Sequence, residues 1–286
     1  MAAILAFDVG GSHIAAARVA GDALADRAEI TVDPDGGAED ILARWRQVGV
    51  QAAAGQPLAG IAVAFPRPFD YAHGICRTRH KFAALYGRDL RQWLAAAFGL
   101  PPAAVRFRND ADAFLVGALH GEGMAAAPRA MGITLGTGLG SAFWAGGGIV
   151  EAGPGVPPEG EIYCLPWRDG TLEDALSTRA LVRAYAAAGG EAATVQAIAA
   201  RAIGGEPRAL ATWRGFGAEL GAGLGPIIAA FRPAVILLGG NISRAAALFL
   251  PAAEAALAGA GARLRPVAAL DAAALVGAAR ACFPAG

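Results

Sequence analysis

Lysine is nearly missing from this chain of 286 residues, in which Lys81 is the only one. A P-loop requires a Gly-Lys-Ser/Thr element, and a protein kinase requires a lysine on one of its strands. The sequence therefore excludes both kinds of nucleotide site. Any phosphate group must instead be bound by backbone amides of glycine-rich turns, because glycine lets the backbone approach phosphate oxygens closely.

Cysteine is also scarce, and its placement excludes two kinds of site. Cys76, Cys164 and Cys282 lie far apart and form no CxxC pair. This pattern argues against a disulfide framework and against a cysteine zinc site, and it fits a reducing compartment. No positively charged segment precedes the apolar residues 1–7, so we expect no secretory signal and a cytoplasmic location.

The chain has no excess of either charge, since Lys+Arg and Asp+Glu each number 24. It therefore has no overall attraction to nucleic acid or to an anionic membrane, and we expect a small-molecule partner. The uncharged stretch 130–150 is long enough for a membrane span. Its seven glycines favour a β-hairpin instead.

Glycine is abundant, and two glycine-rich turns occur in similar surroundings. The turns at residues 8–12 and 136–140 each lie between two predicted strands. A dinucleotide-binding fingerprint would require a helix after the glycines, so this pattern does not match one. Either turn alone could be an ordinary hairpin. Together they predict two related lobes that face a common cleft, each with a phosphate-binding turn.

Asp110 lies at a predicted strand-to-helix junction. Residues 105–108 are typical of a short strand, and the apolar spacing from Ala111 to Leu119 is that of a helix. Asn109 and Asp110 therefore fall where Asx side chains cap free backbone N–H groups. An ordinary cap is one interpretation. A carboxylate held near two phosphate-binding turns favours the other, which is phosphoryl transfer.

Several other segments flank the predicted site. The sequence predicts an exposed helix over residues 39–48, a buried strand over 60–65, a polar loop over 67–81 and a helix over about 89–98. Further helices are expected over 172–188 and 213–231. A strand at 234–238 runs into Gly239 and Gly240, which is typical of a nucleotide site and equally of a plain connection.

These motifs, in their order, resemble those of the ROK family of sugar kinases, in the actin and hexokinase superfamily. The resemblance covers nearly the whole chain. It rests on DVGGS at 8–12, RNDAD at 108–112, LGTGLGSAFWAGG at 135–147, GEI at 160–162, LE at 172–173 and VILLGGNIS at 235–243.

The resemblance implies an α/β protein with the two-lobed actin-like, ribonuclease H-like ATPase fold and a mixed sheet in each lobe. We expect a small lobe at residues 1–108 and a large lobe at 109–271. A C-terminal helix at about 272–286 is expected to pack back on the small lobe. The resemblance also implies a homodimer.

The family's site residues carry over by position. Asp110 would be the general base that accepts the proton of the attacking sugar hydroxyl, and Asn109, Glu161 and Glu173 would bind other sugar hydroxyls. Asp8 would orient Mg²⁺ through water. The phosphates of ATP would meet Gly10, Gly11, Ser12, Thr137 and Gly138, and the adenosine would lie against Gly239 and Gly240.

The sequence departs from the family pattern in three places. Tyr163 and Cys164 stand where the family signature has glycine and histidine, and the three-cysteine zinc motif that would follow is missing. We therefore expect no structural zinc. Arg67 replaces the glycine of a PGP turn, where it is either a solvated loop residue or a contact to an anionic group. These changes leave the identity of the sugar open.

The resemblance predicts ATP-dependent phosphorylation of a hexose or hexose derivative, as in a glucokinase. Family repressors carry an N-terminal helix-turn-helix domain, whereas the first strand here is expected from about Ala3. The alternative to the kinase is a catalytically weak sugar sensor or ATP-binding regulatory protein. The phosphorylated hydroxyl is not determined by the sequence, nor is the choice between ATP and polyphosphate.

Overall fold

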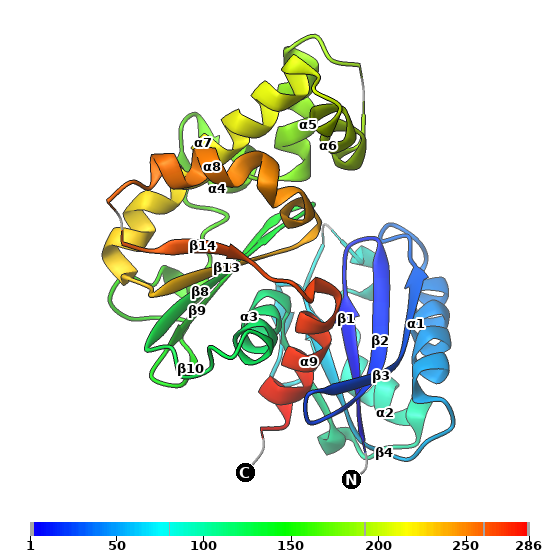
Figure 1. Cartoon of the computed structure of the whole chain (residues 1–286). Coiled ribbons are helices and arrows are strands. Elements are labelled where there is room, and N and C mark those ends of the chain that lie inside the picture. The colour runs from blue at the N-terminus through cyan, green and yellow to red at the C-terminus, as the bar shows by residue number, and fades with distance from the viewer. Residues whose placement is uncertain (1–2, 80, 192, 260, 285–286) are drawn as a thin grey trace. The chain divides into compact units, whose positions relative to one another are not determined.

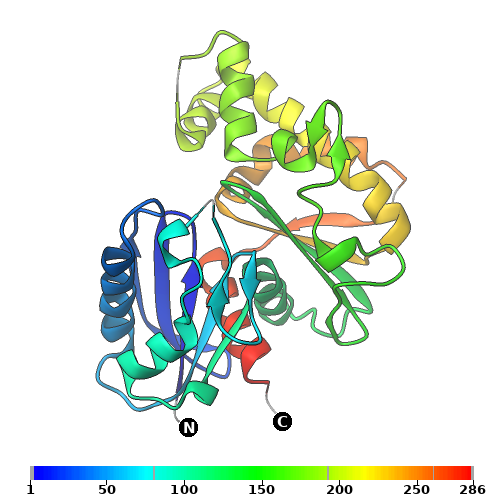
Figure 2. The ribbon, with the colours of Figure 1, turned by 180° about the vertical axis from the view of Figure 1, so that it is seen from behind.

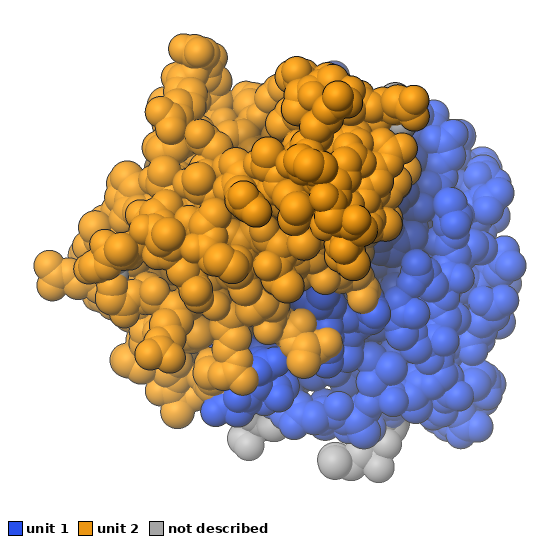
Figure 3. All heavy atoms as spheres, turned by 45° about the horizontal axis from the view of Figure 1, so that its top comes forward, with its two compact units in different colours: residues 1–123, 269–286 blue, residues 124–268 orange. Residues whose placement is uncertain are grey.

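The computed structural model of the chain divides into two compact units, coloured separately in Figure 3. Unit 1 comprises residues 1–123 and 269–286, and unit 2 comprises residues 124–268. The structure describes residues 3–79, 81–191, 193–259 and 261–284.

Unit 1 is built on a five-stranded mixed sheet (Figure 1). Its strand order is β3 (Ala23–Thr31), β2 (His13–Ala20), β1 (Ala3–Val9), β4 (Leu58–Phe65) and β7 (Val105–Asn109). The first three strands pair antiparallel, whereas β1, β4 and β7 run parallel. The carboxyl ends of those three strands therefore lie at one edge of the sheet, which is where α/β proteins place their ligands.

The two faces of this sheet differ in side-chain size. Alternating residues of β1 such as Leu5 and Phe7 belong to a core with Trp45, which is fully buried. The residues between them are small, and Ala6 packs with Leu275 on the opposite face. Helices of the unit are α1 (Ala38–Ala53), α2 (Leu90–Phe98), α3 (Asp110–Gly121) and α9 (Leu270–Cys282). The predicted exposed helix at 39–48 is therefore wrong in its burial, because α1 presents an apolar face to the sheet.

Helices α3 and α9 lie side by side in both views (Figure 2). Gly117 and Gly277 make this approach possible. A Cβ atom on Gly117 would overlap the carbonyl oxygen of Ala273, and one on Gly277 would overlap that of Ala113. Because α3 is packed on α9, the compact unit continues past the expected lobe boundary at residue 108 and ends at Gly123. The predicted C-terminal segment also included residues 285–286, which lie outside the described residues.

Unit 1 has smaller elements as well. A hairpin of β5 (Phe69–Asp70) and β6 (Ile75–Cys76) follows β4, and the 3₁₀ turns are η1 (Ala83–Leu85) and η2 (Pro102–Ala104). The polar loop predicted at 67–81 thus contains a short antiparallel hairpin, and the predicted helix at 89–98 is present as α2. Asp89 caps this helix by accepting the N–H of Gln92 at 2.9 Å.

Unit 2 repeats the sheet arrangement of unit 1. Its strand order is β10 (Gly148–Ile149), β9 (Leu139–Ala145), β8 (Arg129–Leu135), β13 (Val235–Gly239) and β14 (Arg263–Pro266). Strands β9 and β10 are antiparallel additions, whereas β8, β13 and β14 are parallel. The repeat predicted from the two glycine turns is therefore present in the topology, and residues 130–150 form a hairpin, as expected. No helix in the described ranges has the length and apolar character needed to cross a bilayer.

The helices of unit 2 enclose a core that includes Leu135, Trp213 and Phe249. They are α4 (Leu172–Ala175), α5 (Thr178–Ala187), α6 (Val195–Ile203), α7 (Pro207–Phe231) and α8 (Ala246–Ala256), with η3 (Pro158–Gly160), η4 (Asn241–Ala245) and the hairpin of β11 (Pro166–Trp167) and β12 (Gly170–Thr171). The helix predicted over 172–188 is two helices, because Leu176 leaves the helical conformation (φ −121°, ψ 42°) and Ser177 is extended.

Candidate active site

The predicted site residues of unit 1 gather at one edge of its sheet. Asp8 lies near the end of β1, and residues 10–12 of the first glycine turn follow this strand. Arg67 follows β4, Asn109 ends β7, and Asp110 begins α3. Strand pairing places Asp8 beside Ala64 and Phe65 beside Asn109. The structure therefore brings together residues that are about 100 positions apart in the sequence.

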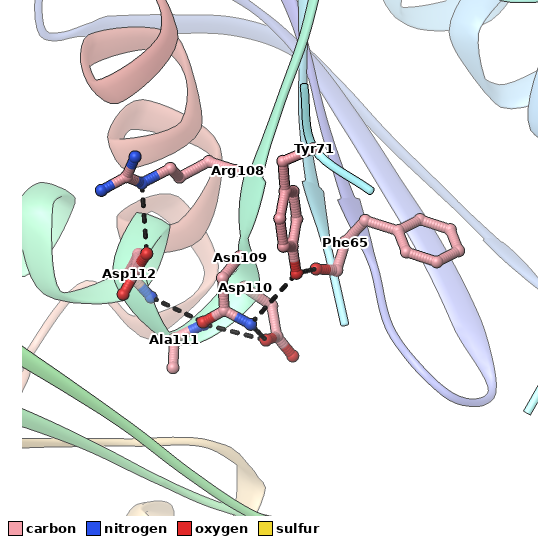
Figure 4. Close-up of polar contacts among 7 residues, drawn as sticks. All are labelled: Phe65, Tyr71, Arg108, Asn109, Asp110, Ala111 and Asp112. Atoms are coloured by element: carbon pink, nitrogen blue, oxygen red, sulfur yellow. Dashed lines mark hydrogen bonds and ion pairs between the residues drawn. The ribbon is translucent and has the colours of Figure 1, made fainter. Parts of the chain in front are cut away.

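Asn109 is the N-cap of α3 (Figure 4). Its side-chain oxygen accepts hydrogen bonds from the N–H groups of Ala111 and Asp112 at 3.0 and 3.2 Å. Its amide nitrogen donates to Asp110 Oδ1 at 3.0 Å, and the Ala111 N–H also donates to that oxygen at 3.0 Å. Asp110 is thus fixed at the helix start by its neighbours, while Asn109 performs the capping.

A buried ion pair supports the same turn of helix. Arg108 Nε lies 3.1 Å from Asp112 Oδ2, and the Asp112 side chain is only 5 % exposed. Since the arginine is on β7 and the aspartate is on α3, the pair ties the strand to the helix on either side of Asn109 and Asp110 (Figure 4).

Tyr71 is a residue of this site that the sequence did not identify. Its hydroxyl donates to the Phe65 carbonyl at 2.9 Å and accepts from Asn109 Nδ2 at 3.4 Å. Burial is the main reason that the pKa of Tyr71 is raised, followed by the negative charge of Asp110. The phenol therefore stays protonated and holds the Asn109 amide in one orientation. The only sequence signal for it was its position in the loop after a buried strand.

The charge of Asp110 acts on the ionisation of Asp8. Burial raises the pKa of Asp8 to about 7, and the charge of Asp110 is the next largest cause. Burial also raises the pKa of Asp110, against the Ala111 N–H hydrogen bond and the positive charges of Lys81 and Arg67. The Ala111 N–H and the two cations favour the ionised form of Asp110, which is the form that can accept a proton.

The first glycine turn offers backbone donors. The Gly10 N–H is used within the hairpin, where it donates to the His13 carbonyl at 3.0 Å. Within the described part of the chain, the N–H groups of Gly11 and Ser12 donate no hydrogen bond. Two successive unused amides in a turn are suited to binding an anionic oxygen.

The second glycine turn belongs to unit 2 and is held by Glu173. Glu173 Oε2 accepts the Leu139 N–H at 3.0 Å, and Oε1 lies 3.3 Å from Arg179. A Cβ atom on Gly138 would lie 2.6 Å from the same Oε2, so only glycine lets the carboxylate come so close. The structure therefore places Glu173, expected at the sugar, directly against Gly138, expected at the phosphates.

Glu161 belongs to the same unit as Glu173 and precedes it by 12 positions in the sequence. Ser141 Oγ donates to the Gly160 carbonyl at 2.6 Å and accepts the Ile162 N–H at 3.1 Å, so the segment carrying Glu161 is fixed to β9. The N–H of Glu173 donates to the Tyr163 carbonyl at 3.1 Å. Burial and the charges of Glu161, Cys164 and Glu173 raise the pKa of Tyr163, so its phenol remains protonated beside both glutamates.

Gly239 and Gly240 lie next to the second glycine turn. Gly239 ends β13 and pairs with Thr134 of β8. Gly240 has a φ of 78°, and a Cβ atom there would overlap the backbone of Leu135. Glycine is therefore required where β13 passes the end of β8. Four predicted residues, Thr137, Gly138, Gly239 and Gly240, thus share one edge of this sheet.

The residues at the first turn fit a magnesium ion better than a zinc ion. Asp8 would supply carboxylate oxygens, and a divalent cation would offset the negative charge of Asp110 that acts on Asp8. Mg²⁺ is commonly held by one or two carboxylates, waters and substrate phosphates. Over the ranges that the structure describes, no group of three or more His, Cys, Asp or Glu side chains is arranged to hold a metal ion.

The raised pKa of Asp8 predicts a pH-dependent stability. Asp8 is protonated in the folded chain up to about pH 7, whereas in the unfolded chain it ionises near pH 4. The free energy of unfolding should therefore fall as the pH rises from about 4 to about 7, and then level off. We expect Asp8→Asn to remove at least about 1 kcal/mol of this fall, measured by urea denaturation without divalent cations.

The matched control is Asp35→Asn, a change at an exposed aspartate of the same unit. It should follow the wild-type pH dependence. If Asp8→Asn also follows the wild type between pH 4 and pH 8, Asp8 is ionised throughout that range and the expectation is wrong.

Comparison with known proteins identifies the family. The family model of the ROK family matches residues 4–281. No curated protein matches the chain. The solved structure of a ROK family glucokinase from Streptomyces griseus, in complex with glucose and AMPPNP, is 23% identical, with a TM-score of 0.84 over 99% of this chain and 100% of that chain.

Two further structures share the fold. The ROK hexokinase from Thermus thermophilus is 24% identical, with a TM-score of 0.76 over 98% of each chain. A ROK family transcriptional regulator, a homolog of the E. coli MLC protein, is 21% identical, with a TM-score of 0.74 over 96% of this chain and 77% of that one. The predicted actin-like fold is confirmed by these likenesses. At such identities they show the fold alone.

Proposed function

The chain belongs to the ROK family, and we propose that it is an ATP-dependent carbohydrate kinase that phosphorylates a hexose or hexose derivative. The observation that carries this proposal is the Asp110 carboxylate. It is fixed at the start of α3 at the same sheet edge as a glycine turn with two unused amides. A base beside a phosphate-binding turn is what transfer of a phosphoryl group to a hydroxyl requires.

In the proposed reaction, the sugar hydroxyl attacks the terminal phosphorus of ATP. A bond forms between the hydroxyl oxygen and that phosphorus, while the bond from phosphorus to the bridging oxygen breaks and ADP leaves. Asp110 accepts the hydroxyl proton. Most of the rate comes from positioning and charge neutralisation, and the base accounts for roughly 10²–10⁴ of it.

Sugar recognition is proposed to use Asn109, Glu161 and Glu173. The Asn109 amide is oriented by Tyr71, and Glu173 is oriented by the Leu139 N–H. Carboxylates and an amide suit a polyol, because every missing hydroxyl leaves an acceptor without its partner. The adenosine is proposed to lie against Gly239 and Gly240.

Magnesium is the proposed metal, with Asp8 holding it through water. When bound, the ion neutralises phosphate charge. Asp8 itself would then be ionised at neutral pH, because a divalent cation lowers the pKa of a nearby carboxyl group. The phosphates are proposed to meet Gly10, Gly11 and Ser12 in unit 1 and Thr137 and Gly138 in unit 2.

The test is a coupled assay of ADP release with Mg·ATP across hexoses, N-acetylhexosamines and fructose. With polyphosphate as donor, the sugar phosphate is measured in place of ADP. We expect at least one neutral sugar to raise ADP release at least about 10-fold above the sugar-free rate. A chain that binds sugar with no sugar-dependent turnover on any member of the panel would be a sensor, and the kinase proposal would be wrong. Tyr163 and Cys164, at the positions of family glycine and histidine, are the reason to include unusual hexose derivatives.

A cytoplasmic location and a homodimer remain proposals. The first comes from the cysteine pattern, which fits a reducing compartment, and the second from the family resemblance. Light scattering of the purified chain at several concentrations tests the second.

A further inference from the structure

The only lysine of the chain lies on the first glycine turn. The Cδ and Cε atoms of Lys81 are 3.7 Å, and its Nζ 3.8 Å, from the position that a Cβ atom of Gly11 would occupy. The lysine side chain is therefore extended along the turn, with its ammonium group beside the Gly11 backbone.

The next residue fixes this position. Phe82 is fully buried and donates its N–H to the Pro34 carbonyl at 2.9 Å. Its ring packs 6.1 Å from that of Phe65, the last residue of β4. The turn itself is connected to the same region, since the Val32 N–H donates to the Ser12 carbonyl at 3.0 Å. Lys81 is thus set against Gly11 by a core residue and not only by its own flexible chain.

The electrostatic surroundings give the ammonium group a role. In the part of the chain that the structure describes, Lys81 forms no hydrogen bond or ion pair with another residue. Its positive charge nevertheless acts on Asp110 and lowers the pKa of that carboxyl group, as does the charge of Arg67. The Lys81 ammonium group therefore lies beside Gly11 of the first glycine turn and acts electrostatically on the Asp110 carboxyl group.

Resting on the proposed function, we propose that Lys81 is a second catalytic residue, whose ammonium group contacts the phosphoryl group while it passes from ATP to the sugar. Negative charge is spread over the oxygens of that group in the transition state. A cation placed there in advance stabilises the transition state more than the ground state. The proton of the sugar hydroxyl goes to Asp110.

The alternative for Lys81 is a contact to an anionic group on the sugar. The observations favour the phosphoryl group, because the lysine lies against the glycine turn whose Gly11 and Ser12 N–H groups donate no hydrogen bond among the described residues. Such amides are suited to binding an anion. Arg67 has its guanidinium 5.9 Å from the centre of the Tyr71 ring, and the Tyr71 hydroxyl contacts Asn109, an expected sugar residue. A Lys81 contact to the phosphoryl group predicts that loss of the lysine lowers kcat, whereas a contact to the sugar predicts a raised KM for the sugar.

The experiment compares Lys81→Met and Lys81→Arg with the control Arg79→Met. Arg79 is an exposed cation of the same loop, and its guanidinium stacks 4.0 Å above the Tyr86 ring. Two measurements are made on each variant. The first is the calorimetric affinity for AMPPNP and for ADP with Mg²⁺, and the second is kcat and KM with the best sugar of the panel.

We expect Lys81→Met to weaken AMPPNP binding at least about 10-fold and ADP binding less than about 2-fold, and to lower kcat by about 10²-fold or more, as loss of one transition-state donor does. Lys81→Arg should recover at least a tenth of the wild-type kcat, and Arg79→Met should leave all values unchanged. A merely structural role would change both nucleotide affinities together.

An unchanged preference of Lys81→Met for AMPPNP over ADP, or an unchanged kcat with a raised KM for the sugar, would overturn the proposal. The nucleotide comparison does not require turnover. It therefore decides the role of Lys81 even if the wild-type chain phosphorylates no sugar, an outcome that would refute the proposed function separately.

Discussion

The Asp110→Asn variant is expected to lose sugar-dependent ADP release by a factor of roughly 10²–10⁴, with little change in KM. Asparagine keeps an oxygen that can accept the Asn109 and Ala111 N–H groups, so the start of α3 should be preserved. What it lacks is a site that can accept the proton of the sugar hydroxyl. The measurement is kcat by the coupled ADP assay at saturating ATP and sugar.

Asp89→Asn is the matched control for this variant. It makes the same chemical change at the N-cap of α2, where asparagine caps as well as aspartate. Its kcat should remain within about 2-fold of the wild type. An Asp110→Asn chain that kept more than a tenth of wild-type kcat would show that another group accepts the proton.

The second large effect concerns stability. Gly117→Ala should lower the free energy of unfolding by at least about 2 kcal/mol, because the new methyl group would overlap the Ala273 carbonyl and push α3 away from α9. The backbone at Ala273 is part of helix α9, so it can move aside only at a large cost in free energy, unlike the end of a flexible side chain. Urea denaturation followed by circular dichroism measures the change.

Gly121→Ala provides the comparison on the same helix. Gly121 is one turn further along α3, and nothing lies within 4 Å of the position of its Cβ atom. Alanine is the better helix former, so this variant should be as stable as the wild type or more stable by up to about 1 kcal/mol. Equal stability of the two variants would mean that α3 and α9 are not in close backbone contact.

Local patterns in the sequence predicted those features that depend on residues close together in the chain, namely the strand-to-helix junction and the repeated sheet. The change from a short strand to an apolar helical spacing placed Asn109 and Asp110 at a junction, and the structure has Asn109 as the N-cap there. The repeated strand, turn and strand pattern predicted two similar sheets, and the sheets have the same strand order.

Contacts between distant segments were not predictable in this way. The Tyr71 hydroxyl meets Asn109 across 38 positions, and the Glu173 carboxylate meets the Leu139 N–H across 34. No local periodicity encodes such pairs, because they depend on how a loop crosses a sheet edge. The family resemblance assigned Glu173 to the sugar, but its hydrogen bond to the second glycine turn became visible only in the structure.

One error could have been avoided from the sequence. The helix predicted as exposed carries Ile41, Leu42, Trp45 and Val48, which are spaced as on one helical face and are all buried. The break between α4 and α5 is different. Nothing in residues 172–178 is a strong helix breaker, and the interruption depends on packing, in which Leu176 and Ser177 are both fully buried.

The single lysine also allows the chain to be labelled covalently at one side chain. Apart from the amino terminus, an amine-directed reagent meets only the ε-amine of Lys81, which rests on Gly11. Covalent labelling would therefore mark one position of known surroundings without any engineering of the sequence. The labelling rate would report directly whether the first glycine turn is filled, since a bound phosphate would shield that amine from the reagent.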